Sequence, residues 1–195
     1  MPAAGVPAAA SSAPTETAAR DATAEEDPNT ALGAMEGVPC MLANRAGDAR
    51  WVGEPDVGLT AGMDVLQAWV DENNDTAVSV FACSDYSGAV LLVTPAAAGV
   101  EDIVAKAAQK FSHGESVRVE YQPASLADLL AATNELSARA MDVPGVASIG
   151  VDAIRGVVRI RTSEEPPGVG ERVQDIESAF RDVNPDIAIM WDHQS

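Results

Sequence analysis

The stretch from Val146 to Trp191 constrains the fold most, because its pattern indicates both the type and the order of four elements. Apolar and polar side chains alternate in Val146–Asp152 and again in Val158–Arg161, which is typical of strands with one buried face. The residues between them, Ala153-Ile-Arg-Gly156, form a turn that contains glycine. This stretch therefore predicts a β-hairpin.

A helix and a third strand follow the hairpin. After the breaker Glu164–Gly168, apolar residues recur at spacings of four, three, four and three along one helical stripe: Val169, Val173, Ile176, Phe180 and Val183. Asn184-Pro185 ends the helix, because proline lacks an amide hydrogen and clashes with the preceding turn. Alternation then predicts a closing strand at Ile187, Ile189 and Trp191.

The same order of elements occurs earlier in the chain. Two strands are predicted at Ala77–Cys83 and Gly88–Thr94, a helix at Val100–Phe111, and a strand at Val117–Tyr121. Four aligned pairs lie 68 to 70 residues apart: Gly88 with Gly156, Thr94 with Thr162, Phe111 with Phe180, and Tyr121 with Trp191. Such self-similarity favours a duplicated unit. The alternative is that two unrelated segments share a common pattern.

A further helix is expected before each hairpin. Ser125 with Asp128 resembles a capping box that opens a helix ending near Asp142, and Met63–Val70 gives a shorter helix before the first hairpin. We therefore predict an α+β fold of two repeated helix-hairpin-helix-strand units, 32–124 and 125–195. Each unit should be a small mixed three-stranded sheet with helices on one face, because a strand-helix-strand connection normally makes a parallel crossover.

The chain before the first unit has a different composition. Residues 1–31 are rich in Ala, Pro, Ser, Thr and Glu without apolar periodicity, which predicts a disordered tail. Val38–Leu42 is predicted to be a short strand in a lead-in segment that covers a sheet edge. Because such a tail often follows a cleaved export signal, we expect an extracellular or cell-envelope protein. A cytoplasmic protein is the alternative.

Charge and cysteine content limit the classes of partner. The net charge of −18 argues against binding to nucleic acid or anionic lipid, and no apolar run is long enough to cross a membrane. Cys40 and Cys83 are either one disulfide or two buried small residues. Metal-ligand spacing and nucleotide-binding motifs are absent from the sequence, so we expect no cofactor.

Two places in the chain are candidates for function. Arg159 and Arg161 should stand together on the solvent face of one strand, either as a contact patch for an acidic group or as a solvated face balanced by nearby carboxylates. His113, in the turn Ser112-His-Gly-Glu115, is either a general base with a neighbouring Ser or Glu, or a solvated loop histidine.

Several short motifs resemble a known family. These are Ser125-Leu-Ala-Asp-Leu129, Gly145-Val146, Gly150-Val151-Asp152 and Val157-Val-Arg-Ile160. They look like the pro-region modules of secreted bacterial serine proteases of the alpha-lytic and streptogrisin kind, and like actinobacterial secreted proteins that carry such modules without a protease. The resemblance implies a sheet that packs on a protease and a C-terminal tail, here Trp191–Ser195, that lies in its active-site cleft. The nucleophile motif Gly-Asp-Ser-Gly-Gly does not occur in the sequence, so any partner protease would act in trans.

We therefore predict a non-enzymatic protein-binding chain, with a serine protease as one candidate partner. The sequence does not determine its oligomeric state. Its partner-binding residues are expected to be Arg159, Arg161, Trp191, Asp192 and His193. The alternatives are a small hydrolase that uses His113 and a cytoplasmic acidic interaction protein.

Overall fold

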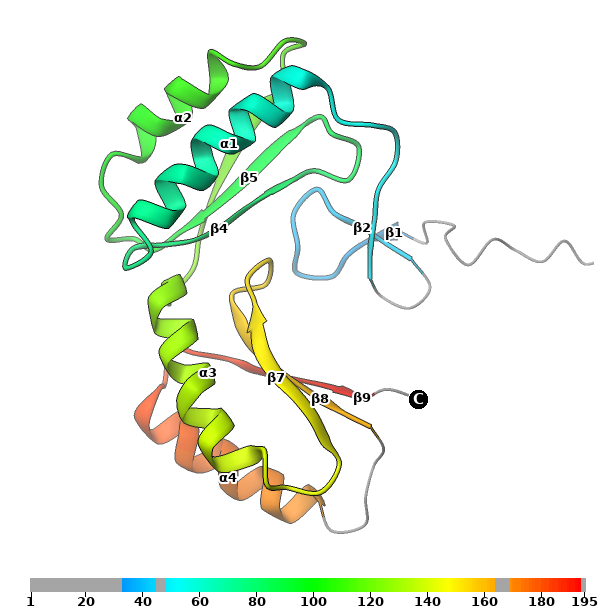
Figure 1. Cartoon of the computed structure of the whole chain (residues 1–195), viewed down its shortest axis with the longest axis vertical. Coiled ribbons are helices and arrows are strands. Elements are labelled where there is room, and N and C mark those ends of the chain that lie inside the picture. Colours follow the sequence, from blue (N-terminus) through cyan, green and yellow to red (C-terminus); the bar gives the residue numbers. More distant parts are fainter. Residues whose placement is uncertain (1–32, 45–47, 164–168, 194–195) are drawn as a thin grey trace, which may run out of the picture.

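Four helices and three small three-stranded sheets form an α+β fold in the computed structural model, which describes residues 33–44, 48–163 and 169–193 (Figure 1). The predicted tail at 1–31 and the predicted breaker at 164–168 lie outside the described residues. Among the described residues, no helix is both long and apolar enough to cross a membrane.

The first sheet follows the predicted order of elements. Helix α1 (Val57–Glu72) precedes the hairpin of β4 (Ala77–Ala82) and β5 (Gly88–Val93), and α2 (Val100–Ala108) leads to β6 (Ser116–Tyr121). The strand order is β4-β5-β6, with β4 antiparallel and β6 parallel to β5. The prediction of a mixed sheet with a helical crossover is therefore confirmed.

The second sheet has the same order and directions. Helix α3 (Leu126–Ala140) precedes β7 (Val146–Asp152) and β8 (Val157–Thr162), and α4 (Val169–Val183) leads to β9 (Ile189–His193). Strand β7 pairs antiparallel with β8, and β9 pairs parallel with β8. Figure 1 shows α3 and α4 on the same side of this sheet.

The two hairpins also share an irregularity in their pairing. In the first, the register shifts between Ala77, which pairs with Val93, and Ser79, which pairs with Leu92. In the second it shifts between Val146, paired with Thr162, and Ser148, paired with Arg161. Each residue of the second set lies 69 positions after its counterpart.

This register corrects the alignment made from sequence. The pairs Gly88 with Gly156 and Thr94 with Thr162 are out of step by one residue. In the parallel pairings, Val119 lies opposite Leu91 and Trp191 lies opposite Ile160, so Trp191 corresponds to Val119 and not to Tyr121.

The predicted match of Phe111 with Phe180 also differs in detail. Phe111 follows the end of α2 and is partly buried, with its ring against Gly62, whereas Phe180 lies within α4 and is fully buried. The α2 helix has 9 residues and α4 has 15, which explains why equal sequence spacing gives unequal positions.

The first sheet is buried on both faces. Leu91 and Val93 of β5 pack with Leu66 of α1 and Ile103 of α2. On the opposite face, Val90 and Leu92 belong to a larger apolar cluster that also contains Met35, Val38 and Met41. All six residues of β5 are consequently buried.

The residues before α1 form a small sheet of their own. It consists of β1 (Gly33–Ala34), β2 (Leu42–Ala43) and β3 (Ala49–Arg50), paired antiparallel. The predicted strand Val38–Leu42 is therefore wrong: Pro39 and Cys40 lie in a turn, and of this range only Leu42 belongs to a strand. Residues between the strands of this N-terminal sheet, Met35, Val38 and Met41, are buried in the apolar cluster that contains Val90 and Leu92, and Leu129 and Leu136 of α3 belong to the same cluster.

A disulfide fastens the N-terminal sheet to the first sheet. Cys40 and Cys83 are bonded, so the first of the two alternatives for these cysteines is the one found. The carbonyl oxygen of Cys40 also accepts a hydrogen bond from the N–H of Ser84, and the N–H of Leu42 donates to the hydroxyl of Ser84. The segment is thus held covalently and by hydrogen bonds at the end of β4.

Candidate partner-binding face of the second sheet

Alternation along β8 separates two faces of the second sheet. Val158 and Ile160 are fully buried under the helices with Phe180, whereas Arg159 and Arg161 point to the other face and are partly exposed. The prediction that both arginines share one solvent face is confirmed. We call this surface the open face of the second sheet.

Asp192 of β9 lies between the two arginines. The parallel register places Asp192 opposite Arg161, and the Oδ2 atom of Asp192 lies 2.5 Å from Nη2 of Arg159 and 3.4 Å from Nε of Arg161. One carboxylate therefore neutralises two guanidinium groups only in part. Both interpretations of the arginines made from sequence retain support, since the pair is balanced by a carboxylate and still carries excess positive charge.

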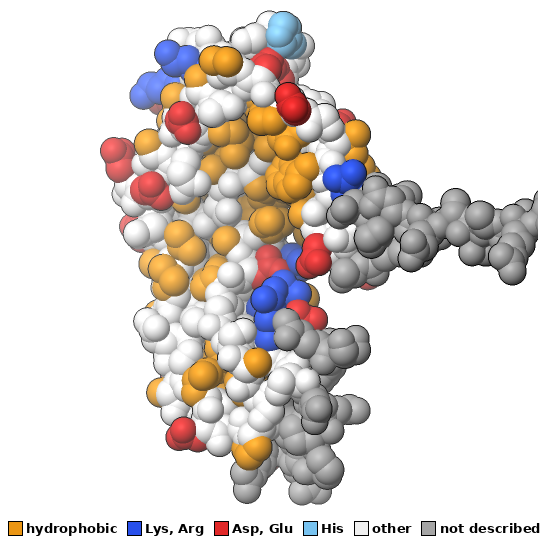
Figure 2. Space-filling model, turned by 45° about the vertical axis from the view of Figure 1, so that its right-hand side comes forward, with side chains coloured by type: hydrophobic (Ala, Val, Ile, Leu, Met, Phe, Trp, Pro, Cys, Tyr) orange, Lys and Arg blue, Asp and Glu red, His pale blue; other side chains and the backbone are white. Residues whose placement is uncertain are grey.

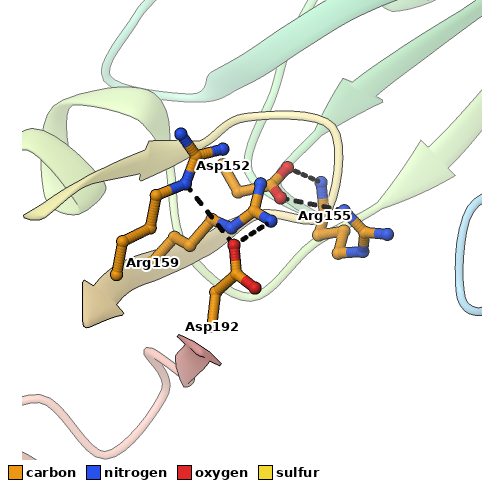
Figure 3. A network of polar contacts seen from close by, with 5 residues as sticks. Asp152, Arg155, Arg159 and Asp192 are labelled. Atoms are coloured by element: carbon orange, nitrogen blue, oxygen red, sulfur yellow. Dashed lines mark hydrogen bonds and ion pairs between the residues drawn. The ribbon is translucent and has the colours of Figure 1, made fainter. Parts of the chain in front are cut away.

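A second ion pair lies at the β7–β8 turn. Nη1 of Arg155 contacts Oδ2 of Asp152 at 2.9 Å, and the backbone N–H of Arg155 donates to Oδ1 of the same carboxylate. Figure 3 shows this pair next to the pair formed by Arg159 and Asp192. The two contacts between Arg155 and Asp152 hold the turn against the end of β7.

A hollow of about 440 Å³ lies on the open face. Gly150 contributes to its floor, and a Cβ atom at that position would meet nothing within 4 Å, so the space above it is open. Three arginines, Arg155, Arg159 and Arg161, line the hollow, whereas the carboxylates around them are Asp152 and Asp192. The Nε atom of Arg159 is buried without a hydrogen-bond partner among the described residues. The hollow therefore favours an acceptor or carboxylate group of a ligand.

Trp191 lies on the opposite face from Asp192. Its ring packs beside the apolar core, and its Nε1 donates a hydrogen bond to Glu177 of α4. Neighbouring residues of a strand point to opposite faces, so Trp191 cannot join the arginines. Its position suits a structural role. Of the predicted site residues whose side chains the structure describes, Arg159, Arg161 and Asp192 are brought together and Trp191 is not.

The predicted tail, Trp191–Ser195, begins within strand β9. His193 is the last residue of β9, where it pairs with Thr162, and Gln194 and Ser195 lie outside the described residues. Strand β9 is at the edge of the sheet order β7-β8-β9, so its outer backbone groups face away from β8. An edge strand of this kind can add a strand from another chain.

His113 lies far along the chain from this face, in an exposed turn. Its side chain is 77% exposed, its Nε2 lies 3.4 Å from Oδ2 of Asp56, and its backbone N–H donates to Glu115. The pKa of Asp56 is lowered mainly because this carboxylate accepts a hydrogen bond from the N–H of Leu59, and the charge of His113 adds to the effect. These contacts join His113 to carboxylates, while a hydrolytic role for it stays a prediction.

Sequence reasoning missed an apolar groove on the first unit. Trp51 stacks on Tyr86 with ring centroids 5.5 Å apart, and Met63 and Phe81 also line the groove. No signal in the sequence joins these residues, because Trp51 lies in a stretch without periodicity and the others belong to α1, β4 and a turn. The described residues contain no group of three or more His, Cys, Asp or Glu side chains that could hold a metal ion.

No protein-family model matches this chain, and a search of curated proteins finds no match to it. The resemblance to protease pro-regions therefore stays a prediction.

Proposed function

We propose that this chain is an exported, non-enzymatic module that binds another protein through the open face and the β9 edge of the second sheet. The observation that supports this most is the contrast between two corresponding faces. Val90 and Leu92 of the first sheet are buried in an apolar cluster with residues of the N-terminal segment and of α3, whereas Arg159 and Arg161, 69 positions later, line a hollow. A face of this topology is thus suited to receive a further layer.

Duplication of one unit is the second part of the proposal. Beyond the shared strand order, Asp56 caps α1 and Ser125 caps α3, and these two residues also lie 69 positions apart. The backbone N–H of Thr94 donates to Thr76, and that of Ser163 donates to Gly145, again at the same spacing. Matching registers, bulges and caps are more than a common pattern of strand, helix and strand requires.

We propose a secreted serine protease as the partner, acting in trans. The resemblance of residues 76–195 to protease pro-regions motivates this choice, and the hollow with Arg159 and Arg161 would receive an acidic group of the enzyme. Strand β9 would add to a sheet edge of the enzyme. The disulfide between Cys40 and Cys83 is consistent with an oxidising compartment, where such a protease acts.

Inhibition of a mature protease tests the proposal. The full chain is mixed with mature alpha-lytic protease or a mature streptogrisin, and hydrolysis of a peptide substrate is followed. We expect inhibition by the native chain, and inhibition about tenfold weaker for Arg161→Ala and for a chain that ends at Asp192. Arg139→Ala is the matched control, because Arg139 is an exposed arginine of α3 paired with Glu135.

Two results would contradict the proposal. Absence of inhibition at any chain concentration would remove the protease as partner. Equal inhibition by the native chain, Arg161→Ala and the shortened chain would mean that the open face and the β9 edge are not the binding surface.

A further inference from the structure

The apolar groove of the first unit has the properties of a second binding surface. Its volume is about 350 Å³, and its walls include Trp51, Leu59, Met63, Phe81 and Tyr86. Figure 2 shows hydrophobic side chains gathered over this upper part of the molecule. Trp51 and its neighbour Val52 remain 37% and 49% exposed. Exposed aromatic surface in a groove is typical of a protein-binding site.

The groove is held in shape before any ligand arrives. Tyr86 has a backbone φ of 57°, in the left-handed region that few residues other than glycine adopt, and its N–H donates to the carbonyl of disulfide-bonded Cys83. The N–H of Val52 donates to the carbonyl of Ser84 at 2.7 Å, which keeps Trp51 against Tyr86. Side chains that are already positioned lose little conformational freedom on binding.

Carboxylates form one rim of the groove. An adjoining hollow of about 440 Å³ shares Tyr86 with the groove and is lined by four carboxylates: Glu54, Asp56, Asp85 and Glu115. Hydrogen bonds from the side chain and backbone of Ser87 lower the pKa of Asp85, so this carboxylate is charged at neutral pH. His113 is the basic side chain within this hollow, and Arg50 precedes Trp51 in the chain. The rim is therefore strongly acidic.

The acidic rim decides among three occupants. Residues 1–32 of the chain itself contain five acidic residues and one basic residue, and a second copy of the chain carries a net charge of −18. The tail would meet like charge at the rim, and a second copy would bring a large overall negative charge to it, which opposes the binding of both. A segment with apolar side chains flanked by Lys or Arg would instead bury its apolar groups in the groove and pair its charges with the rim.

We propose that the groove bounded by Trp51, Met63 and Tyr86 binds a basic, apolar peptide segment of a second protein. Apolar side chains of the segment occupy the groove, and its cationic side chains lie beside Glu54 and Asp85. This surface belongs to the first unit and does not depend on the open face of the second sheet.

Three short synthetic peptides test the proposal against the full chain by isothermal titration calorimetry. One peptide is composed of Leu and Lys, the second has Glu in place of Lys, and the third has Ser in place of Leu. We expect the Leu and Lys peptide to bind at least about tenfold more tightly than either of the others. Added salt should weaken its binding, because exposed charges are screened.

Variants locate the binding surface. Trp51→Ala should weaken binding of the Leu and Lys peptide about tenfold, while Val183→Ala, which alters an exposed apolar residue of α4, should leave it unchanged. Glu54→Gln should weaken binding about two- to fivefold, the effect of one exposed ion pair, whereas Glu101→Gln on α2 should not. If Trp51→Ala fails to fold, the comparison of Glu54→Gln with Glu101→Gln still tests whether the peptide binds at this groove.

Three outcomes would overturn the proposal. If the Ser and Lys peptide bound as tightly as the Leu and Lys peptide, binding would result only from attraction between a cationic peptide and an acidic chain. Tighter or equal binding of the Leu and Glu peptide would exclude a role for the acidic rim. Unchanged binding in Trp51→Ala would place the site elsewhere.

Discussion

The first and second sheets have the same strand order and directions but differ in what covers their second face. The central strand β5 is apolar at every position and is buried on both sides. The central strand β8 alternates, with Arg159 and Arg161 where β5 has Val90 and Leu92. In both sheets, helices cover one face. The composition of the central strand determines whether the other face becomes core or surface.

Exchanging the two kinds of residue is the most severe test of this comparison. Leu92 is 1% exposed, so Leu92→Arg places an unpaired charge in the core and should lower the free energy of unfolding by about 4 kcal/mol or more. Arg161→Leu, at the corresponding position of the second sheet, should change it by no more than about 0.5 kcal/mol. Urea unfolding measures both variants. A similar loss in both would mean that the second sheet is covered on both faces.

Removing the two aromatic rings that the sequence aligned should also give unequal effects. Phe180 is fully buried, so Phe180→Ala should lower the free energy of unfolding by about 3–5 kcal/mol. Phe111 is only partly buried, and Phe111→Ala should lower it by about 1–2 kcal/mol. Thermal and urea unfolding provide the comparison. Equal losses of stability would support the alignment of Phe111 with Phe180 that was made from the sequence.

Loss of the disulfide should affect the first sheet more than the second. Replacing Cys40 and Cys83 by Ser should lower the free energy of unfolding by about 2–4 kcal/mol, because the unfolded chain is no longer restrained. Met35, Val38 and Met41 should then leave the apolar cluster with Val90 and Leu92 more often. Amide hydrogen exchange should report faster exchange in β5 than in β8 relative to the native chain. Equal acceleration in both strands would mean that the N-terminal segment does not stabilise the first sheet in particular.

The N-cap of α3 provides a smaller effect. The hydroxyl oxygen of Ser125 accepts a hydrogen bond from the N–H of Asp128 at 3.1 Å, so Ser125→Ala should lower the free energy of unfolding by about 1 kcal/mol. Ser125→Thr, which preserves both the acceptor and the hydroxyl that donates to Asp128, is the conservative variant and should retain part of the stability. A loss as large in Ser125→Thr as in Ser125→Ala would assign the effect to packing of this buried side chain.

The stabilisation that the corresponding N-cap of α1 provides should depend on pH, because this cap is a carboxylate. The N–H of Leu59 donates to Oδ1 of Asp56, and this bond is the main cause of the lowered pKa of Asp56. A lowered pKa in the folded state means that the stabilisation is present above the ordinary value of 3.8 and is lost as the pH falls through the folded-state pKa. Asp56→Ala should therefore be less stable than the native chain at neutral pH, and the difference should shrink in acid. A difference independent of pH would contradict a contribution from the charged carboxylate.

Periodic segments could be predicted from the sequence, and segments without periodicity could not. Alternation in Val157–Thr162 correctly placed Arg159 and Arg161 on one face, and the spacing of Ser125 and Asp128 correctly gave a capping box. The N-terminal sheet was missed because its strands have two residues each, too few for a pattern. The number of cysteines allowed a disulfide but did not require one.

The candidate sites show the same limit. Strand alternation alone separates Trp191 from Asp192, so the structural position of Trp191 follows from a rule that the sequence already allowed. The groove around Trp51 and Tyr86 was not accessible to such reasoning, because its walls come from segments far apart in the chain. Its shape also depends on the left-handed backbone of Tyr86, which no neighbouring residue type indicates.

The bond between Cys40 and Cys83 joins residues 43 positions apart, and helix α1 and strand β4 lie wholly between them. A single proteolytic nick in that interval would therefore leave two fragments in one molecule. Nicked protein would migrate as one band on a non-reducing gel and as two bands after thiol treatment. A protease that cleaved there would not separate the amino-terminal portion from the rest.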